Sequence, residues 1–202
     1  MSVYYYNGAK ILAPFTVISN EPMYDADSVS LRKQRASQDV QRWEIEFKTI
    51  LETDDQATAL VNSVVDRDTS TTMVMPQLPG PDSTFNVNVE TVSINSTGNV
   101  GDSTVELNET GISGTLPKGY FVKFSNHDKL YLVTADFAFS GAGTGNLSIY
   151  PSLRSEVTNL DSVKLGSLAV FSYYRDISNL NGITFTDGVL SEQGSVRLVE
   201  AL

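Results

Sequence analysis

Residues 42–51 follow a period of two. The charged positions are Arg42, Glu44, Glu46 and Lys48, and they alternate with Trp43, Ile45, Phe47, Thr49 and Leu51. Side chains that repeat every two residues lie on one face of an extended strand, so the pattern predicts an antiparallel strand with one buried face. A helix would spread the same residues around its circumference. This segment therefore indicates a fold based on β-sheet.

Nine further segments have strand-like composition. They are rich in Val, Ile, Phe, Tyr and Thr, and Gly, Asn, Asp or Pro residues bound them. They are residues 9–18, 73–75, 85–94, 103–107, 120–125, 129–134, 145–150, 168–174 and 195–199. We therefore expect a mainly β fold.

One segment predicts a helix. Thr53 and Gln56 have the spacing of a capping box, and Asp54 and Asp55 lie in the first turn, where the helix dipole favours negative charge. Apolar residues then recur at helical spacing, at Ala57, Leu60, Val61, Val64 and Val65. We expect this stripe to pack against the sheet that contains Trp43.

A proline-rich connector at residues 76–82 divides the chain. Proline lacks a backbone N–H and cannot continue a sheet, so the connector predicts a stiff link between two domains. The short strands that follow, separated by turn sequences, indicate a compact barrel. We expect a first domain formed by residues 1–80 and 175–202 and interrupted by a barrel domain at residues 81–174.

Composition excludes several kinds of site. The chain has no Cys and one His, which excludes disulfides, thiolate metal sites and zinc sites built from several histidines. With 24 acidic and 14 basic residues the net charge is -10, which opposes binding to nucleic acid phosphates but suits a passage through which DNA slides. We expect no secretory signal and no membrane-spanning segment.

Residues 141–145 contain three glycines but lack the spacing and the lysine of phosphate-binding loops. Strands rather than a helix flank them. We interpret this stretch as a flexible hairpin loop rather than as a nucleotide site.

The acidic group Glu52, Asp54 and Asp55 could be a carboxylate pair or a cation site. No calcium-loop spacing occurs there or at Asp25 and Asp27. Helix capping with a solvated acidic patch is the favoured interpretation.

His127 lies between two predicted strands, and no nucleophile motif accompanies it, so we favour a turn histidine over a catalytic base. We expect no catalytic residue, no cofactor and no metal, and hence no enzyme. A polysaccharide hydrolase with two carboxylates across a cleft is the least favoured hypothesis.

The one basic cluster contains Arg32, Lys33 and Arg35, within a polar segment that we expect to be irregular. In an acidic chain we favour salt bridges to a neighbouring subunit, or a mobile loop, over nucleic acid binding. We expect the tyrosine run that includes Tyr4 and Tyr5 to dock on a partner as an N-terminal arm.

With these residues in place, the chain resembles the distal tail proteins of long-tailed siphophages. Three stretches carry the likeness. Residues 38–65 hold a tryptophan-bearing strand followed by the amphipathic helix, and residues 195–202 form the terminal strand. Residues 116–134 and 145–153 are the most specific: a hydrophobic strand, a turn with a His, a Tyr-bearing strand and a strand ending in Tyr-Pro.

The resemblance implies a tube-like β-sandwich or split-barrel domain that assembles into a hexameric ring between the tail tube and the tail tip. It implies an OB-like barrel inserted in that domain and projecting outward. The implied partners are copies of the chain, the tail tube protein and hub or fibre proteins. The implied location is the virion, after synthesis in the cytoplasm of the host bacterium.

In such a ring, acidic residues around the channel would repel the DNA backbone and let it pass without sequence-specific binding. We expect Glu52, Asp54, Asp55, Asp66 and Asp68 to line it. An alternative function is a barrel that binds cell-surface carbohydrate or a fibre, because OB-type barrels often bind oligosaccharides. That alternative predicts exposed aromatic residues on the barrel, with Tyr131 as the residue to test.

Overall fold

The computed structural model of the protein describes residues 5–6, 9–27, 33–37, 40–50, 70–78, 85–141, 143–176, 183–186 and 189–202. For residues 34–37, 183–186 and 189–194 it describes the backbone only. The regular structure of these residues is β-strand apart from one short 3-10 turn, Gly166–Leu168, so the predicted all-β fold is confirmed. The helix expected at residues 53–65 lies outside the described residues.

The chain divides into two compact units. The barrel unit comprises mainly residues 72–172, and the sheet unit comprises residues 3–71 and 173–201. The boundaries therefore fall between residues 71 and 72 and between residues 172 and 173, whereas the sequence predicts them at 80/81 and 174/175. The proline-rich connector is grouped with the barrel.

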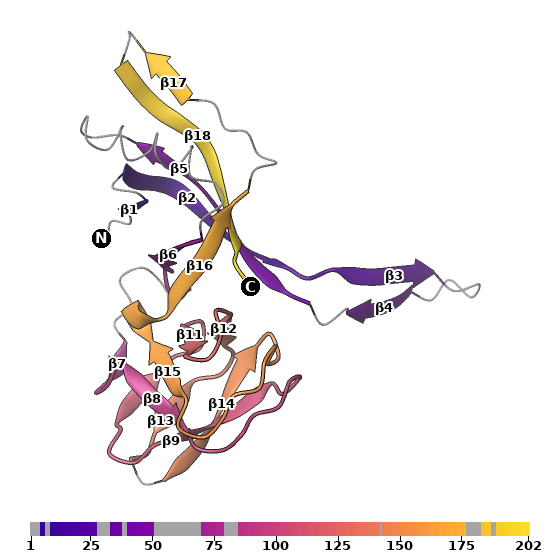
Figure 1. Ribbon diagram of the computed structural model, residues 1–202, viewed down its shortest axis with the longest axis vertical. Coiled ribbons are helices and arrows are strands. Elements are labelled where there is room, and N and C mark those ends of the chain that lie inside the picture. The colour runs from indigo at the N-terminus through magenta and orange to yellow at the C-terminus, as the bar shows by residue number, and fades with distance from the viewer. Residues whose placement is uncertain are drawn as a thin grey trace. The chain divides into compact units, whose positions relative to one another are not determined.

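A seven-stranded sheet contains most of the sheet unit, in the order β1-β2-β5-β18-β16-β6 with β17 beside β18 (Figure 1). Its strands are β1 (Tyr5–Tyr6), β2 (Ala9–Asn20), β5 (Arg42–Ile50), β6 (Thr71–Val74), β16 (Val170–Arg175), β17 (Ile183–Thr186) and β18 (Val189–Glu200). The last strand of the chain, β18, pairs antiparallel with β5, which places Leu198 opposite Ile45. The fold of this unit therefore depends on pairing between segments about 150 residues apart, with the barrel sequence between them.

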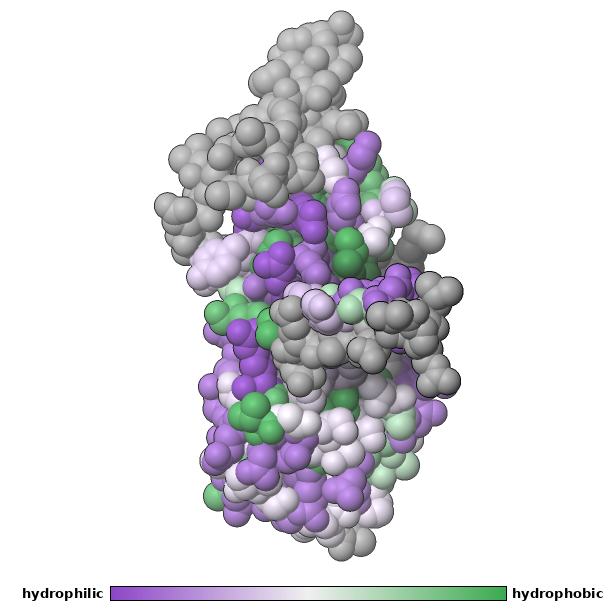
Figure 2. All heavy atoms as spheres, turned by 90° about the vertical axis from the view of Figure 1, so that its right-hand side faces the viewer, coloured by the Kyte–Doolittle hydropathy of each residue, from purple (hydrophilic) through white to green (hydrophobic). Residues whose placement is uncertain are grey.

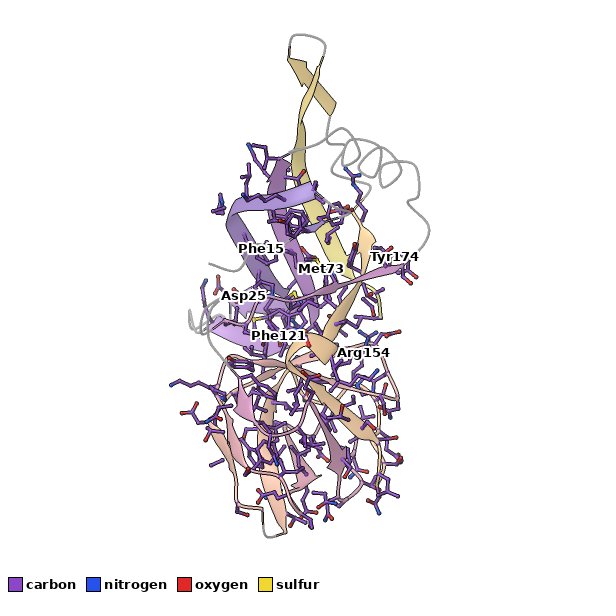
Figure 3. All side chains as sticks on the ribbon, turned by 90° about the vertical axis from the view of Figure 1, so that its left-hand side faces the viewer. Phe15, Asp25, Met73, Phe121, Arg154 and Tyr174 are labelled. Carbon is purple, nitrogen blue, oxygen red and sulfur yellow. The ribbon has the colours of Figure 1, made fainter. Side chains whose placement is uncertain are left out.

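One face of β5 is buried as its alternation predicts. Trp43, Ile45 and Phe47 are all buried, which excludes Trp43 as a surface platform for sugars. Tyr6 packs edge-on against Phe47 with ring centroids 5.3 Å apart, and Phe15, labelled in Figure 3, stacks on Phe47 at 5.7 Å. The expectation that the whole tyrosine run docks on a partner is wrong for Tyr6, because this ring completes the aromatic core of its own chain.

The barrel unit contains a closed barrel in the order β11-β12-β14-β9-β8-β15. Its strands are β8 (Thr91–Ile94), β9 (Thr104–Asn108), β11 (Phe121–Phe124), β12 (Leu130–Val133), β14 (Thr144–Tyr150) and β15 (Ser162–Leu165). Every neighbouring pair is antiparallel, and the pairing of β11 with β15 closes the ring. The barrel thus has one strand more than the five of an OB-fold.

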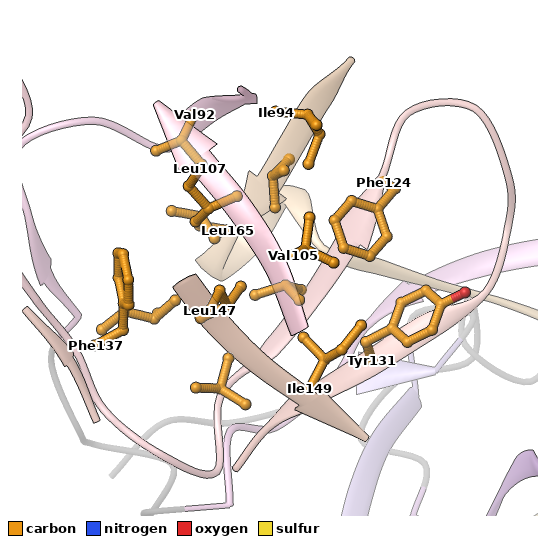
Figure 4. Close-up of a cluster of buried hydrophobic side chains, with 14 of the residues drawn as sticks. Val92, Ile94, Val105, Leu107, Phe124, Tyr131, Phe137, Leu147, Ile149 and Leu165 are labelled. Carbon is orange, nitrogen blue, oxygen red and sulfur yellow. The ribbon is translucent and has the colours of Figure 1, made fainter. Parts of the chain in front are cut away.

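Each barrel strand contributes two buried residues to one core (Figure 4). They are Val92, Ile94, Val105, Leu107, Val122, Phe124, Tyr131, Val133, Leu147, Ile149, Val163 and Leu165. On β9 the alternation is plain, because Val105 and Leu107 are buried while Glu106 between them is not. Burial of this many aliphatic and aromatic side chains is the main source of stability for the unit.

A second, three-stranded sheet in the barrel unit has the order β13-β10-β7. Its strands are β7 (Asn86–Val87), β10 (Gly114–Leu116) and β13 (Phe137–Phe139). Gly114 has a φ of +112, and a Cβ placed there would lie 1.8 Å from the backbone oxygen of Asn86. A glycine is therefore required where β10 meets β7.

Two strands contradict the expected irregular segment around the basic cluster. They are β3 (Met23–Asp27) and β4 (Lys33–Ser37), which pair antiparallel as a separate two-stranded sheet. Hydrophobic periodicity does not reveal them, because a strand such as β3, which has no buried residue, needs no apolar alternation. The strands β1, β10, β13, β15 and β17 are likewise absent from the segments predicted from sequence.

Candidate assembly interface

The hairpin of β3 and β4 is the structural feature most suited to binding another protein, and we call it the arm. In Figure 1, β2 leads into β3 and β4 leads back into β5, while the arm itself projects away from the sheet. No residue of β3 is buried, and Met23 and Tyr24 are 55% and 63% exposed. A two-stranded hairpin exposed on both faces is marginally stable in water, so the arm is suited to being covered by a partner.

The register of the arm separates charged from uncharged positions. Asp25 lies opposite Arg35 and Asp27 opposite Lys33, whereas Tyr24 lies opposite Ala36. Because neighbouring residues of a strand point to opposite faces, Tyr24 lies on the face that lacks these charges. This face offers an exposed aromatic ring without a charge that binding would have to desolvate.

Lys33 and Asp25 form an ion pair within the arm. Lys33 Nζ lies 3.8 Å from Asp25 Oδ2, and both side chains are exposed, so the pair contributes at most about 1 kcal/mol. The sequence does contain a signal for this hairpin, although it is not one of hydrophobic periodicity. Two acidic and two basic residues are placed symmetrically about residues 28–32, the arrangement that puts opposite charges across an antiparallel pair.

The structure places only some of the predicted interface residues. Lys33 is exposed on the arm, Arg35 lies in β4, and Tyr5 is 53% exposed on β1, the outer strand of the sheet. Tyr4 and Arg32 lie outside the described residues. So do all five acidic residues predicted to line the channel, which are Glu52, Asp54, Asp55, Asp66 and Asp68.

A charged cluster lies on the sheet at the base of the arm, and its centre is the fully buried Glu44. The Glu44 carboxylate accepts hydrogen bonds from Asn20 Nδ2 at 2.8 Å and from Arg42 Nε at 2.9 Å, and it also pairs with the Arg197 guanidinium. Asn20 is the last residue of β2 and Arg42 the first of β5, and the two are paired in the sheet. The cluster therefore joins the two strands at the point where the arm leaves them, and ties both to β18.

Protonation of Glu44 should weaken this cluster. Burial by itself would raise the pKa of Glu44, but hydrogen bonds from Arg197 and Asn20 and the charge of Arg197 lower it overall from its ordinary value of 4.5. A carboxyl group whose pKa is lower in the folded state stabilises the fold above pH 4.5. It loses that contribution as the pH falls through the folded-state value.

We expect Glu44→Gln to destabilise the sheet unit by about 2 kcal/mol at neutral pH, because it removes a buried partner of two arginines. The difference from the wild type should shrink as the pH falls below 4.5. Fluorescence of Trp43, the one tryptophan of the chain, measures this because Trp43 is in the sheet unit. Glu46→Gln, on the same face of β5, is the matched control, and an equal loss in both variants would refute the special role of Glu44.

The surface of the barrel unit does not provide the aromatic platform that carbohydrate binding predicts. No Phe, Tyr or Trp side chain is exposed among the described residues of this unit, and Tyr131 is fully buried. On the face shown in Figure 2, hydrophobic residues over the barrel form small groups among hydrophilic ones. The Tyr131→Ala test of glycan binding would therefore disrupt the core rather than a binding surface.

His127 lies in a turn as the sequence predicts. The hairpin loop expected at residues 141–145 is wrong, because β13 pairs with β10 whereas β14 pairs with β12 and β9. His127 lies in the turn between β11 and β12, and residues 140–143 join β13 to β14. Within the described ranges, no group of three or more His, Cys, Asp or Glu residues could hold a metal ion. The same ranges contain no helix long and apolar enough to cross a membrane. No protein-family model and no curated protein matches the chain.

Proposed function

We propose that the protein is a structural subunit that binds copies of itself side by side to form a ring, as the distal tail protein of a phage tail. The observation that carries self-assembly is the arm, a hairpin with both faces exposed and an aromatic ring on its uncharged face. Its assignment to a phage tail rests on the resemblance of residues 38–65, 116–134, 145–153 and 195–202.

The sheet unit supports a copy of the chain as the partner of the arm. The outer strands of its sheet are β1 and β6, together with β17, which pairs with β18 alone. The strand β6 includes no charged side chain and no proline. Charges and prolines are the usual means by which an open edge is kept from pairing with another chain. In a ring, each subunit would cover the exposed arm and the open sheet edge of the next subunit. One repeated contact would then bury both surfaces.

The net charge of -10 supports a role in DNA passage. An acidic channel repels phosphates and would let DNA slide without binding. On the charged face of β5, by contrast, Glu44 and Glu46 are accompanied by Arg42 and Lys48, so this face does not carry the excess of negative charge. We propose that the channel is lined by the acidic residues at positions 52–68.

Size-exclusion chromatography with light scattering, followed by negative-stain electron microscopy, tests this proposal on the full chain. We expect rings of one defined stoichiometry that appear as the protein concentration rises, or when the tail tube protein is added. A strict monomer under both conditions, with no rings on the grid, would rule the proposal out.

A further inference from the structure

The two strands of the arm carry charges of opposite sign. Strand β3 contains Asp25 and Asp27 and no basic residue, whereas β4 contains Lys33 and Arg35 and no acidic residue. In the described part of the chain, β3 and β4 form a sheet of their own, so each strand has one edge that faces away from the other. The arm therefore has an acidic edge and a basic edge.

The charges of the arm stay accessible although they also interact within it. The side chains of Asp25 and Lys33 are 3.8 Å apart, yet they remain 43% and 63% exposed, and Asp27 is exposed as well. An inner strand of a sheet has a neighbour on both sides, and opposite charges placed across a strand pair stabilise the pair. A second basic strand on the outer side of β3 would therefore meet the two aspartates in the same way as β4 does.

Symmetry decides which edges of two arms can meet. In a contact made by a two-fold axis the same edge lies on both sides, so β3 would lie against β3, or β4 against β4. Either pairing places like charges opposite each other, which destabilises it. In a head-to-tail contact the acidic edge of one copy meets the basic edge of the next. Each acidic strand then has a basic strand on both sides.

From this separation of charge we infer that the arm pairs edge to edge with the arm of a second copy of the chain, with β3 of one subunit beside β4 of the next. The inference rests on the proposed self-assembly and adds the contact and its direction. The two strands run antiparallel in this contact, as they do inside the arm, when the arms of neighbouring copies point the same way. A head-to-tail contact repeats from copy to copy until a ring closes. The like charges disfavour the two-fold dimer that would end the assembly.

A variant in which the two strands exchange their charges tests the inference. It combines Asp25→Arg and Asp27→Lys in β3 with Lys33→Asp and Arg35→Asp in β4. Opposite charges still face each other across the arm, and the net charge of the chain stays at -10. We expect this variant to form rings by itself. It should not enter rings with the wild type, because every mixed contact places like charges opposite each other.

Native mass spectrometry of a mixture with isotopically labelled wild type measures this selectivity, at concentrations where each protein forms rings alone. Two cross-strand pairs change from attractive to repulsive in each mixed contact, so we expect mixed contacts to be about 30-fold weaker. Unchanged Trp43 fluorescence is the control for folding of the sheet unit. Rings that mix freely would overturn the inference. Free mixing is the result expected if β6 makes the contact instead, since β6 has no charge that distinguishes the two arms.

Two half-exchanged variants make the test independent of the fourfold variant. Asp25→Arg with Asp27→Lys gives an arm with basic residues on both strands, and Lys33→Asp with Arg35→Asp gives an arm with acidic residues on both. We expect neither variant to form rings alone, and their equal mixture to form rings of alternating subunits. Rings from either variant alone, or a mixture that stays monomeric, would also overturn the inference. A wild-type chain that stays monomeric would instead refute the proposed function itself.

Discussion

We expect replacement of Gly114 by alanine to destabilise the barrel unit by about 3 kcal/mol or more. At a φ of +112 any L-residue is strained, and the new Cβ would lie 1.8 Å from Asn86 O and 2.8 Å from Val87 Cα. These are backbone atoms of β7, so no side chain can rotate away and the two strands must separate. Thermal unfolding followed by far-ultraviolet circular dichroism should show the loss, while the transition reported by Trp43 in the sheet unit stays in place.

Two other glycines separate the causes of this loss. Gly101 also has a positive φ, of +94, but nothing lies within 4 Å of its Cβ position. Gly101→Ala therefore measures backbone strain alone, for which we expect about 1 kcal/mol. Gly143 has neither a positive φ nor a close neighbour, and Gly143→Ala should change stability by less than about 0.5 kcal/mol. Equal effects in all three variants would contradict the close packing of β10 against β7.

Replacement of Tyr24 by aspartate should abolish ring assembly while leaving the subunit folded. An exposed tyrosine that becomes buried at an interface commonly contributes about 2 kcal/mol, which corresponds to roughly 30-fold in affinity. A closed ring contains this contact once per subunit, so the loss is repeated at every interface and closure fails. Light scattering should show a monomer at concentrations where the wild type forms rings, with unchanged Trp43 fluorescence.

Val100→Asp is the matched control for this experiment. Val100 is 64% exposed, close to the 63% of Tyr24, and it lies on a turn of the barrel unit. The control introduces the same charge on an equally exposed apolar residue and should leave the rings intact. If Tyr24→Asp formed rings at the same concentrations as the wild type, the arm would not be the contact between subunits.

Residues of the candidate interface could be predicted from the sequence only in part. The basic residues Lys33 and Arg35 are assigned from the sequence to salt bridges with a neighbouring subunit or to a mobile loop. Their strand β4 is missed, and with it the hairpin. Tyr24 is missed altogether, because one aromatic residue among polar neighbours carries no periodic signal. Its position on the uncharged face follows only from the register with Ala36.

Local side-chain pattern was enough to predict that this protein is mainly β. Alternation at residues 42–49 predicts that Trp43, Ile45 and Phe47 of β5 are buried, as they are. The geometry of a single strand is enough to place these three side chains on one face. The same holds for most strands of the barrel, where period-two hydrophobicity and turn residues mark each segment. Composition likewise sufficed to exclude disulfides and thiolate metal sites.

Tertiary structure alone decided the features that depend on distant residues. Glu44 alternates with apolar residues and is expected in water, yet it is fully buried because Arg197, 153 residues later in the chain, lies over it from β18. Closure of the barrel with six strands also depends on pairing between segments that are distant in the sequence. The side-chain pattern within one segment predicts which face of that segment is apolar. It does not predict which other segment will cover the polar face.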